Sequence, residues 1–313
     1  MPDAIRGNDG QREADMNTSP IQRILVPTDL SEFSDLALDY ALLFQKKLGA
    51  QITLLYAEEF TLLTSGEYYY ADDAAHMKKR ASRLLHEYIT KHVPSTSPVA
   101  TMLVDDIPGR AIVMTADDVN ADLIIMGSHG RHGLRRALLG SVTERVLRET
   151  TRPVMTVVPK IRPVDSETKI ATILCPVNFT DVAREALENA CALAGALEAQ
   201  VIVMHVVERE DDTTPANVET RFHSWVDPLV RGRTRYEQVV SAGEPAARVL
   251  EVADQVRADL IVLGAQHKLF SDATVIGTTT ERVTRFAHQP VLTITRRAAA
   301  AAREKPEQLV AVG

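Results

Sequence analysis

The chain carries one sequence pattern twice, and this repetition limits its possible folds more than any other feature. Residues 24–31 read ILVPTDLS, and residues 173–180 repeat them as ILCPVNFT. Residues 121–127 read ADLIIMG, and residues 258–264 repeat them as ADLIVLG. Two copies indicate two tandem domains, because solenoid architectures usually stack more repeats than this.

Within each copy, short apolar runs alternate with segments of helical spacing. In the first copy, the residues predicted as strands are 23–27, 51–57, 99–104, 123–126 and 153–158. The predicted helices span 32–48, about 72–91 and 110–119, and a further helix begins near residue 141. Alternating strands and helices form a parallel sheet with helices on both faces. The sequence therefore predicts an α/β protein made of two tandem doubly wound, Rossmann-like domains.

The composition of the connecting segments predicts where these domains begin and end. We expect a disordered tail over residues 1–20, a first domain over 21–158, a linker over 159–169, a second domain over 170–296 and a C-terminal tail over 297–313. Residues 58–71, which include Tyr68, Tyr69 and Tyr70, are predicted to form a surface loop. His205 and Trp225 are predicted to serve packing.

Composition and charge limit the partners of the chain. Its net charge is −7, which gives no electrostatic reason to expect binding to nucleic acid. No apolar run approaches the ~20 residues that cross a bilayer, so no membrane partner is expected, and the polar N-terminal segment does not have the pattern of a signal peptide. The only cysteines, Cys175 and Cys191, are predicted to be buried thiols of a cytoplasmic protein, because their spacing fits neither a disulfide scaffold nor a zinc site.

A glycine-rich stretch follows the predicted strand over 123–126 and reads MGSHGRHGLRRALLGSVT from Met126 to Thr143. A strand, a glycine loop and a helix start in this order favour a phosphate site, because glycine lets a ligand approach the backbone amides and a helix N-terminus attracts anions. The structural alternative is that Gly127 only closes the strand and that Ser141 and Glu144 form a capping box. Glycine content alone leaves both interpretations open.

The spacing within this stretch is Gly127-x2-Gly130-x9-Gly140-Ser141, which is neither a Walker A loop nor G-x-G-x-x-G. It resembles the nucleotide loop of the ATP-binding branch of the universal stress protein family. That resemblance implies five-stranded sheets of order 3-2-1-4-5 and a bound ATP, ADP or AMP. The residues that match the family's nucleotide contacts are Pro27, Asp29, Ala57, Met126, Gly127, Gly130, Gly140, Ser141, Val142 and Thr143. The predicted contacts also include their neighbours Thr28, Ser128, His129 and Arg131.

Asp29 is the residue of this set with two plausible roles. Its carboxylate can accept hydrogen bonds from ribose hydroxyls or lie near a phosphate-bound magnesium ion. The alternative is an N-cap of the following helix. Arg135 and Arg136 add positive charge to the loop, whereas the side chains of His129, Arg131 and His132 are expected to be solvated. No metal site made by the protein alone and no catalytic residue is predicted.

The second copy departs from the motif at two positions. Asn178 stands where Asp29 stands in the first copy, and His267 stands where Gly130 does. A side chain at the second glycine occupies space that phosphates need, and the amide removes a charge. The sequence therefore predicts one intact nucleotide site and one doubtful site.

These observations favour an ATP-binding stress-response regulator that is not an enzyme. The resemblance also implies that domains associate through their last strands, so we expect the two copies to pair as a pseudo-dimer within one chain and chains to form homodimers. Two other classes compete with this one. The first is a slow ATPase or a phosphoryl- or adenylyl-transfer enzyme, and the second is a scaffold without nucleotide or with a hydrophobic ligand in the second domain.

Overall fold

The computed structural model describes residues 20–58, 71–128, 139–158, 164, 167–208, 215–265 and 277–295. Its first half consists of β1 (Arg23–Thr28), α2 (Glu32–Leu48), β2 (Gln51–Glu58), α3 (Ala71–His92), β3 (Val99–Asp105), α4 (Pro108–Asp118), β4 (Leu123–Gly127), α5 (Ser141–Glu149) and β5 (Val154–Val157). Each strand and helix predicted for the first copy is present, with ends shifted by a few residues at most. The predicted tails and the predicted loop lie outside the described residues except for residues 20, 58 and 71, and of the predicted linker only residues 164 and 167–169 are described.

The second half repeats this order. It consists of β6 (Thr172–Pro176), α6 (Asp181–Leu197), β7 (Gln200–Val207), α7 (Pro215–Trp225), the short α8 (Asp227–Val230), β8 (Tyr236–Ala242), α9 (Pro245–Gln255), β9 (Leu260–Ala265), α10 (Thr278–Phe286) and β10 (Val291–Thr295). Helix α7 is shorter than its counterpart α3, which agrees with the shorter sequence of the second copy.

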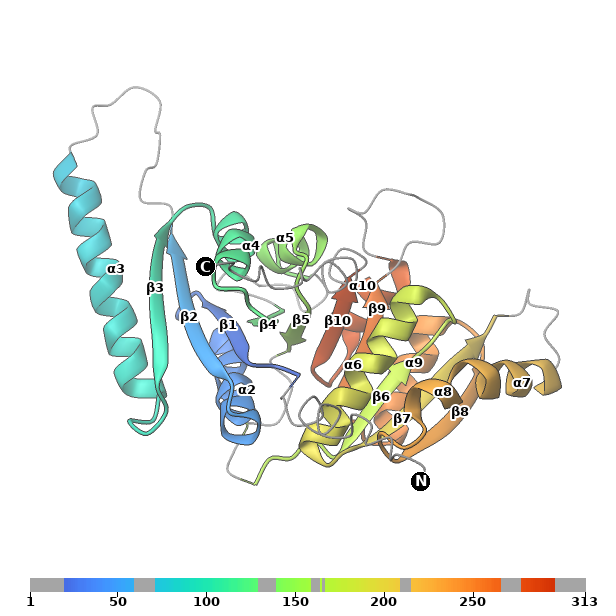
Figure 1. Ribbon diagram of the computed structural model, residues 1–313. Helices are drawn as coiled ribbons and strands as arrows, with labels where there is room; N and C mark the ends of the chain where they lie inside the picture. The colour runs from blue at the N-terminus through green and yellow to red at the C-terminus, as the bar shows by residue number, and fades with distance from the viewer. Residues whose placement is uncertain are drawn as a thin grey trace, which may run out of the picture.

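The ten strands of the described residues form one sheet in the order β3-β2-β1-β4-β5-β10-β9-β6-β7-β8. Each half therefore has the order 3-2-1-4-5, and its neighbouring strands are parallel. The predicted fold class is confirmed. The halves meet at β5 and β10, which pair antiparallel with Met155 opposite Leu292. Figure 1 shows these two strands in the middle of the molecule, with α3 beside β3 at one end of the sheet.

The two faces of the sheet are packed differently. On one face, α2 and α6 cover a single apolar core that contains residues of both halves, such as Phe44, Met155 and Leu292. On the other face, a core under α4 and α5 and a core under α9 and α10 are separate clusters. Side chains alternate between faces along a strand, so Val154 joins the core under α4 while its neighbour Met155 joins the shared one. The shared core holds the two halves together.

The repeated Ala-Asp pair of the sequence has a structural role in both halves. The carboxylate of Asp122 accepts hydrogen bonds from the amides of Gln22 and Arg23 at 3.1 and 3.0 Å, where β1 begins. Asp259 accepts the equivalent bonds at the start of β6, at 2.8 and 2.9 Å. Each aspartate therefore satisfies amides that precede a central strand of the sheet.

Helix α2 ends at Gly49, as its sequence predicts. Gly49 has φ of +72°, and its amide donates to the carbonyl of Gln45 at 2.9 Å. This left-handed C-cap is favourable for glycine, which has no Cβ to clash with the backbone. Among the described helices, none is both long and apolar enough to span a membrane.

Candidate functional site

The described parts of the predicted site meet at the carboxyl edge of the first half of the sheet. Strand β1 lies between β2 and β4, so the direction in which the chain adds strands reverses beside it. Ligands of doubly wound sheets bind at this reversal, beyond the carboxyl ends of the strands. Thr28 ends β1, Gly127 ends β4, and Ala57 lies one residue before the end of β2.

Asp29 occupies the turn between β1 and α2. Its Oδ1 accepts hydrogen bonds from the amide and the hydroxyl of Ser31, at 3.1 and 2.5 Å. The N-cap of α2 is Ser31 and not Asp29, so the interpretation of Asp29 as the N-cap is wrong. Leu30, between them, has φ of +61°, which is uncommon for a residue with a side chain. The surrounding structure therefore has to hold this turn in place.

The side chain of Thr28 is committed to the interior of this turn. It is buried, its hydroxyl lies 2.9 Å from the hydroxyl of Ser34, and it accepts a hydrogen bond from the amide of Leu30 at 2.9 Å. Pro27 is buried too and pairs with Leu55 of β2. These two predicted contact residues therefore shape the turn that carries Asp29.

The two described residues that flank the glycine-rich loop most closely in space, Ser128 and Gly140, lie next to each other. The amide of Ser128 donates to the carbonyl of Val157, and the amide of Gly140 donates to the carbonyl of Ser128, both at 2.8 Å. The start of α5 is thus held beside the end of β4. His129, Gly130 and Arg131, together with Arg135 and Arg136, lie outside the described residues, so their predicted positions are untested.

Helix α5 begins in a way that leaves Ser141 exposed. Gly140 is its N-cap and has no side chain to cap with, and Ser141 is the first helical residue. Ser141 and Glu144 therefore do not form the capping box that the sequence allowed. The carboxylate of Glu144 instead pairs with Arg148 at 2.5 Å. The exposed hydroxyl of Ser141 and the amides of the first turn lie at the positive end of the helix.

Three of the predicted contact residues have side chains that serve packing. Met126 is buried in the core under α4 and α5, and Val142 packs against that core. Thr143 is buried, and its hydroxyl donates to the carbonyl of Gly127 at 2.9 Å. The equivalent bond in the second half runs from Thr280 to Gly264 at 3.4 Å. Thr143 therefore ties a helix to a strand end in a manner that both halves share.

The comparison with known families is decisive for the class of protein. The model of the Universal stress protein family matches residues 20–158, 169–222 and 226–295. The chain belongs to this family. Universal stress protein MJ0577 of Methanocaldococcus jannaschii is 32% identical over 153 residues, and the match covers 94% of that protein and 44% of this chain. Universal stress protein MJ0531 of the same organism is 29% identical over 145 residues, covering 81% of it and 44% of this chain.

A solved structure extends the likeness to both halves. A universal stress protein from Archaeoglobus fulgidus has a TM-score of 0.68 with this chain, 24% sequence identity, and a match that covers 90% of this chain and 98% of that one. At this identity the likeness concerns the fold. The two halves are thus tandem universal stress domains, whereas each of the Methanocaldococcus relatives matches less than half of the chain.

The second universal stress domain keeps the turn but changes its chemistry. Asn178 Oδ1 accepts a hydrogen bond from the hydroxyl of Thr180 at 2.7 Å, as Asp29 does from Ser31. Phe179 has φ of +58°, close to the value at Leu30. The amide therefore reproduces the turn without its negative charge. His267 lies outside the described residues.

Gly264 shows that a glycine at the end of the fourth strand of a domain has a purely structural reason. A Cβ atom at Gly264 would lie 2.7 Å from Cγ1 and 2.8 Å from the carbonyl oxygen of Val182 in α6. Real Cβ atoms do not approach backbone so closely. The same position in the first domain is Gly127, so its presence alone is not evidence of a ligand.

The second domain also contains an aromatic cluster that agrees with the packing role predicted for His205 and Trp225. The ring of Phe179 lies 4.5 Å from that of His205 and 5.5 Å from that of Trp225. His205 Nδ1 contacts the carbonyl of Val177 at 2.8 Å, and Phe222 is fully buried beside them. His205 and Trp225 therefore pack against aromatic neighbours within the second domain.

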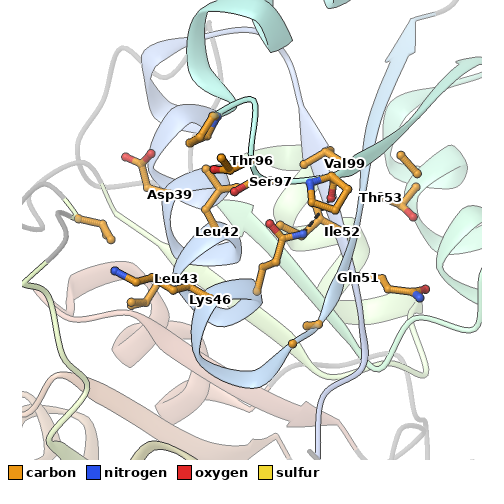
Figure 2. Close-up of a pocket in the computed structure, with 17 residues that line it drawn as sticks. Asp39, Leu42, Leu43, Lys46, Gln51, Ile52, Thr53, Thr96, Ser97 and Val99 are labelled. Atoms are coloured by element: carbon orange, nitrogen blue, oxygen red, sulfur yellow. Dashed lines mark hydrogen bonds between the residues drawn. The ribbon is translucent and has the colours of Figure 1, made fainter.

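A cavity of about 1170 Å³ lies at the opposite edge of the first domain. It is bounded by α2, by the amino ends of β2 and β3, and by the connection that precedes β3; Figure 2 shows its lining residues. Burial and the neighbouring Asp35 raise the pKa of Asp39 in its wall, while His92 lowers it. Val164, between the two domains, also lines it. The cavity is at the wrong end of the strands to be the predicted site.

The described residues contain no group of three or more histidine, cysteine, aspartate or glutamate side chains arranged to hold a metal ion.

A feature that the sequence interpretation missed is Tyr88 of α3, which donates a hydrogen bond to Asp35 at 2.7 Å beneath the Thr28 turn. The sequence signal that could have revealed this contact is the place of Tyr88 on the buried face of α3 with Ala81 and Leu85, because a buried tyrosine hydroxyl needs a hydrogen-bond partner.

Proposed function

We propose that this universal stress protein binds one adenine nucleotide, ATP in the first instance, at the carboxyl edge of its first domain and acts as a regulator without enzymatic turnover. The observation that carries the proposal is the hydrogen bond from Gly140 to Ser128. It holds the positive end of α5 beside β4, next to the central strand β1 that leads into Asp29. A phosphate group and a nucleoside have complementary partners in this arrangement.

Each part of the nucleotide then has a partner of suitable chemistry. The phosphates would lie at the amides of the first turn of α5 and the hydroxyl of Ser141, within reach of the loop that contains His129, Gly130 and Arg131. Asp29 would accept hydrogen bonds from the ribose or lie near a magnesium ion bound to the phosphates. The backbone of β2 at Ala57 would border the base. ADP and AMP share all of these contacts except those of the terminal phosphates.

A regulator is favoured over an enzyme by the state of the polar groups at this edge. The hydroxyls of Thr28 and Thr143 are engaged within the protein, and Asp29 accepts two hydrogen bonds from Ser31. None of these groups is arranged as a base that activates water or a hydroxyl. An ATPase or phosphoryl-transfer enzyme would need such a group.

The assembly and location of the protein form part of the same proposal. The pairing of β5 with β10 supports a pseudo-dimer of the two domains within one chain. In the described sheet, the remaining edges are β3 and β8. A homodimer of whole chains would therefore use a surface other than the fifth strands. We place the protein in the cytoplasm.

The test is calorimetry with Mg-ATP on the full chain, after native mass spectrometry of the purified protein for retained nucleotide. We expect about one site per chain. Asp29→Ala should weaken binding roughly tenfold to a hundredfold, as the loss of a hydrogen bond to a charged group does. Asn178→Ala, at the matched position of the second domain, should leave binding unchanged. Absence of binding would favour a scaffold without nucleotide, and an equal loss in both variants would mean that binding does not depend on the first domain alone.

A further inference from the structure

Tyr88 lies in a polar network directly beneath the turn that carries Asp29. Its side chain is 7% exposed, and its hydroxyl donates to Asp35 Oδ1 at 2.7 Å. Asp35 directly follows Ser34 in α2, and the hydroxyl of Ser34 lies 2.9 Å from that of Thr28. A residue of α3 is thereby linked, through the first turn of α2, to the last residue of the central strand β1.

The network holds both ends of the turn. The hydroxyl of Thr28 accepts from the amide of Leu30 at 2.9 Å, and the hydroxyl of Ser34 donates to the carbonyl of Ser31 at 2.8 Å. Asp29 lies between these two anchored points. The position of its carboxylate therefore depends on where Thr28 and Ser34 are held.

The second domain shows that the network is not needed to form the turn. Val177, Ala183 and Arg184 occupy the positions of Thr28, Ser34 and Asp35, so all three polar side chains of this network are replaced. Phe179 nevertheless adopts φ of +58°, against +61° at Leu30. The backbone conformation is common to both domains, whereas the network accompanies only the domain that has the aspartate.

We propose that Tyr88 is a positioning residue of the nucleotide site, which it serves by fixing Asp35 in the first turn of α2 and, through the adjoining Ser34 and Thr28, the carboxylate of Asp29. This inference rests on the proposed function. Two features of α3 keep the tyrosine in place. Its ring stacks on His92 at 4.5 Å, and His92 Nδ1 lies 3.8 Å from Asp35 Oδ2. Helix α3 thereby becomes part of the site although it contributes no direct contact.

The experiment compares Tyr88→Phe, Ser34→Ala and the double variant by Mg-ATP calorimetry on the full chain. Tyr88→Phe keeps the buried ring, and Ser34→Ala introduces the residue that the second domain already has. Each single change should weaken binding roughly fivefold to tenfold. The double variant should lose no more than the more affected single variant, because both changes act through one network. Tyr40→Phe, which removes another buried tyrosine hydroxyl from α2, should bind like the wild type.

The possible outcomes separate the inference from the proposed function. If Asp29→Ala weakens binding but Tyr88→Phe does not, the inference is wrong and the proposed function stands. If the two single losses multiply in the double variant, the residues act separately and the inference is also wrong. If the wild type binds no nucleotide, both the inference and the proposed function are wrong. Circular dichroism checks that each variant is folded. If Tyr88→Phe does not fold, Thr28→Val replaces it in the same comparison with Ser34→Ala and the double variant. Thr28→Val introduces the residue that the second domain has at the equivalent position, Val177.

Discussion

Met155 of β5 lies opposite Leu292 of β10, and both side chains are buried in the core that the two domains share. This pair lies where the two parallel halves of the sheet meet in an antiparallel contact. Because fully burying a side chain of this size contributes about 2 kcal/mol, the contact of several such residues is a substantial part of the stability of the chain. The two domains should therefore unfold together.

The neighbouring pair, Val154 and Thr293, allows this contact to be tested. Opposite residues of an antiparallel pair have Cβ atoms about 4.5–5.5 Å apart, close enough for a disulfide after small adjustment. We expect Val154→Cys combined with Thr293→Cys to form a disulfide within one chain, seen as a faster monomer band on a non-reducing gel. Neither single variant should show it. Covalent dimers in the double variant alone would indicate that β5 and β10 pair between chains.

Gly264 should not tolerate a side chain. Gly264→Ala would bring a Cβ atom to within 2.8 Å of the backbone of Val182. We expect the free energy of unfolding to fall by ~1–3 kcal/mol, as for other overpacked sites. The control is Gly195→Ala in α6, where the nearest atom would be a carbonyl oxygen at 3.9 Å.

For Gly195→Ala we expect a gain of ~0.5–1 kcal/mol, because alanine is favoured over glycine inside a helix. Urea denaturation monitored by circular dichroism measures both changes. Equal effects of the two substitutions would show that Val182 moves aside without cost.

The stability of the protein should fall at alkaline pH through its buried thiols. Burial raises the pKa of Cys191 from 9.0 to about 11, with a smaller lowering by Arg233 and a further raising by Glu188. The unfolded thiol loses its proton near pH 9.0, and the folded thiol keeps it until about pH 11. The stability contribution is therefore complete below pH 9.0 and is lost as the pH rises toward 11.

Cys191→Ala removes this titration. We expect the variant to lose less stability than the wild type between pH 9.0 and 11, in urea denaturation at fixed temperature. Part of the decrease in stability with rising pH should persist in this variant, because burial also raises the pKa of Cys175. Identical slopes in the variant and the wild type would mean that Cys191 ionises in the folded protein as it does when unfolded.

Bound ATP should survive incubation with the purified protein. Since no described group at the proposed site is arranged as a general base, we expect hydrolysis far below the roughly 1–1000 per second typical of enzymes. A sensitive assay of released phosphate on the wild type, with Asp29→Ala as the control for contaminating activity, measures this. Turnover within the enzymatic range that disappears in Asp29→Ala would move the protein to the enzyme class.

The order of strands and helices could be predicted from the sequence because it depends on local patterns. Apolar runs such as residues 123–126 and helical spacing such as that of residues 32–48 determine an element wherever it is placed. The repeat predicted two tandem domains, and the position of Asp29 directly after a central strand predicted that it lies at the carboxyl edge of the sheet. The contrast between the domains also depends on the loop residues Gly130 and His267, and the effect of these two residues on nucleotide binding remains a prediction.

Hydrogen-bond partners could not be predicted in this way. Tyr88 and Asp35 are 53 positions apart, and their contact exists only because α3 packs against α2. Likewise, the sequence suggested Ser141 as a cap, but the carbonyl of Gly140 accepts the first helical bond, from Glu144 at 2.8 Å, so Gly140 is the N-cap and Ser141 is exposed. The sequence determined the class, the repeat and the elements. The tertiary structure decided which polar groups meet, since buried polar atoms take their partners from whichever elements packing brings near.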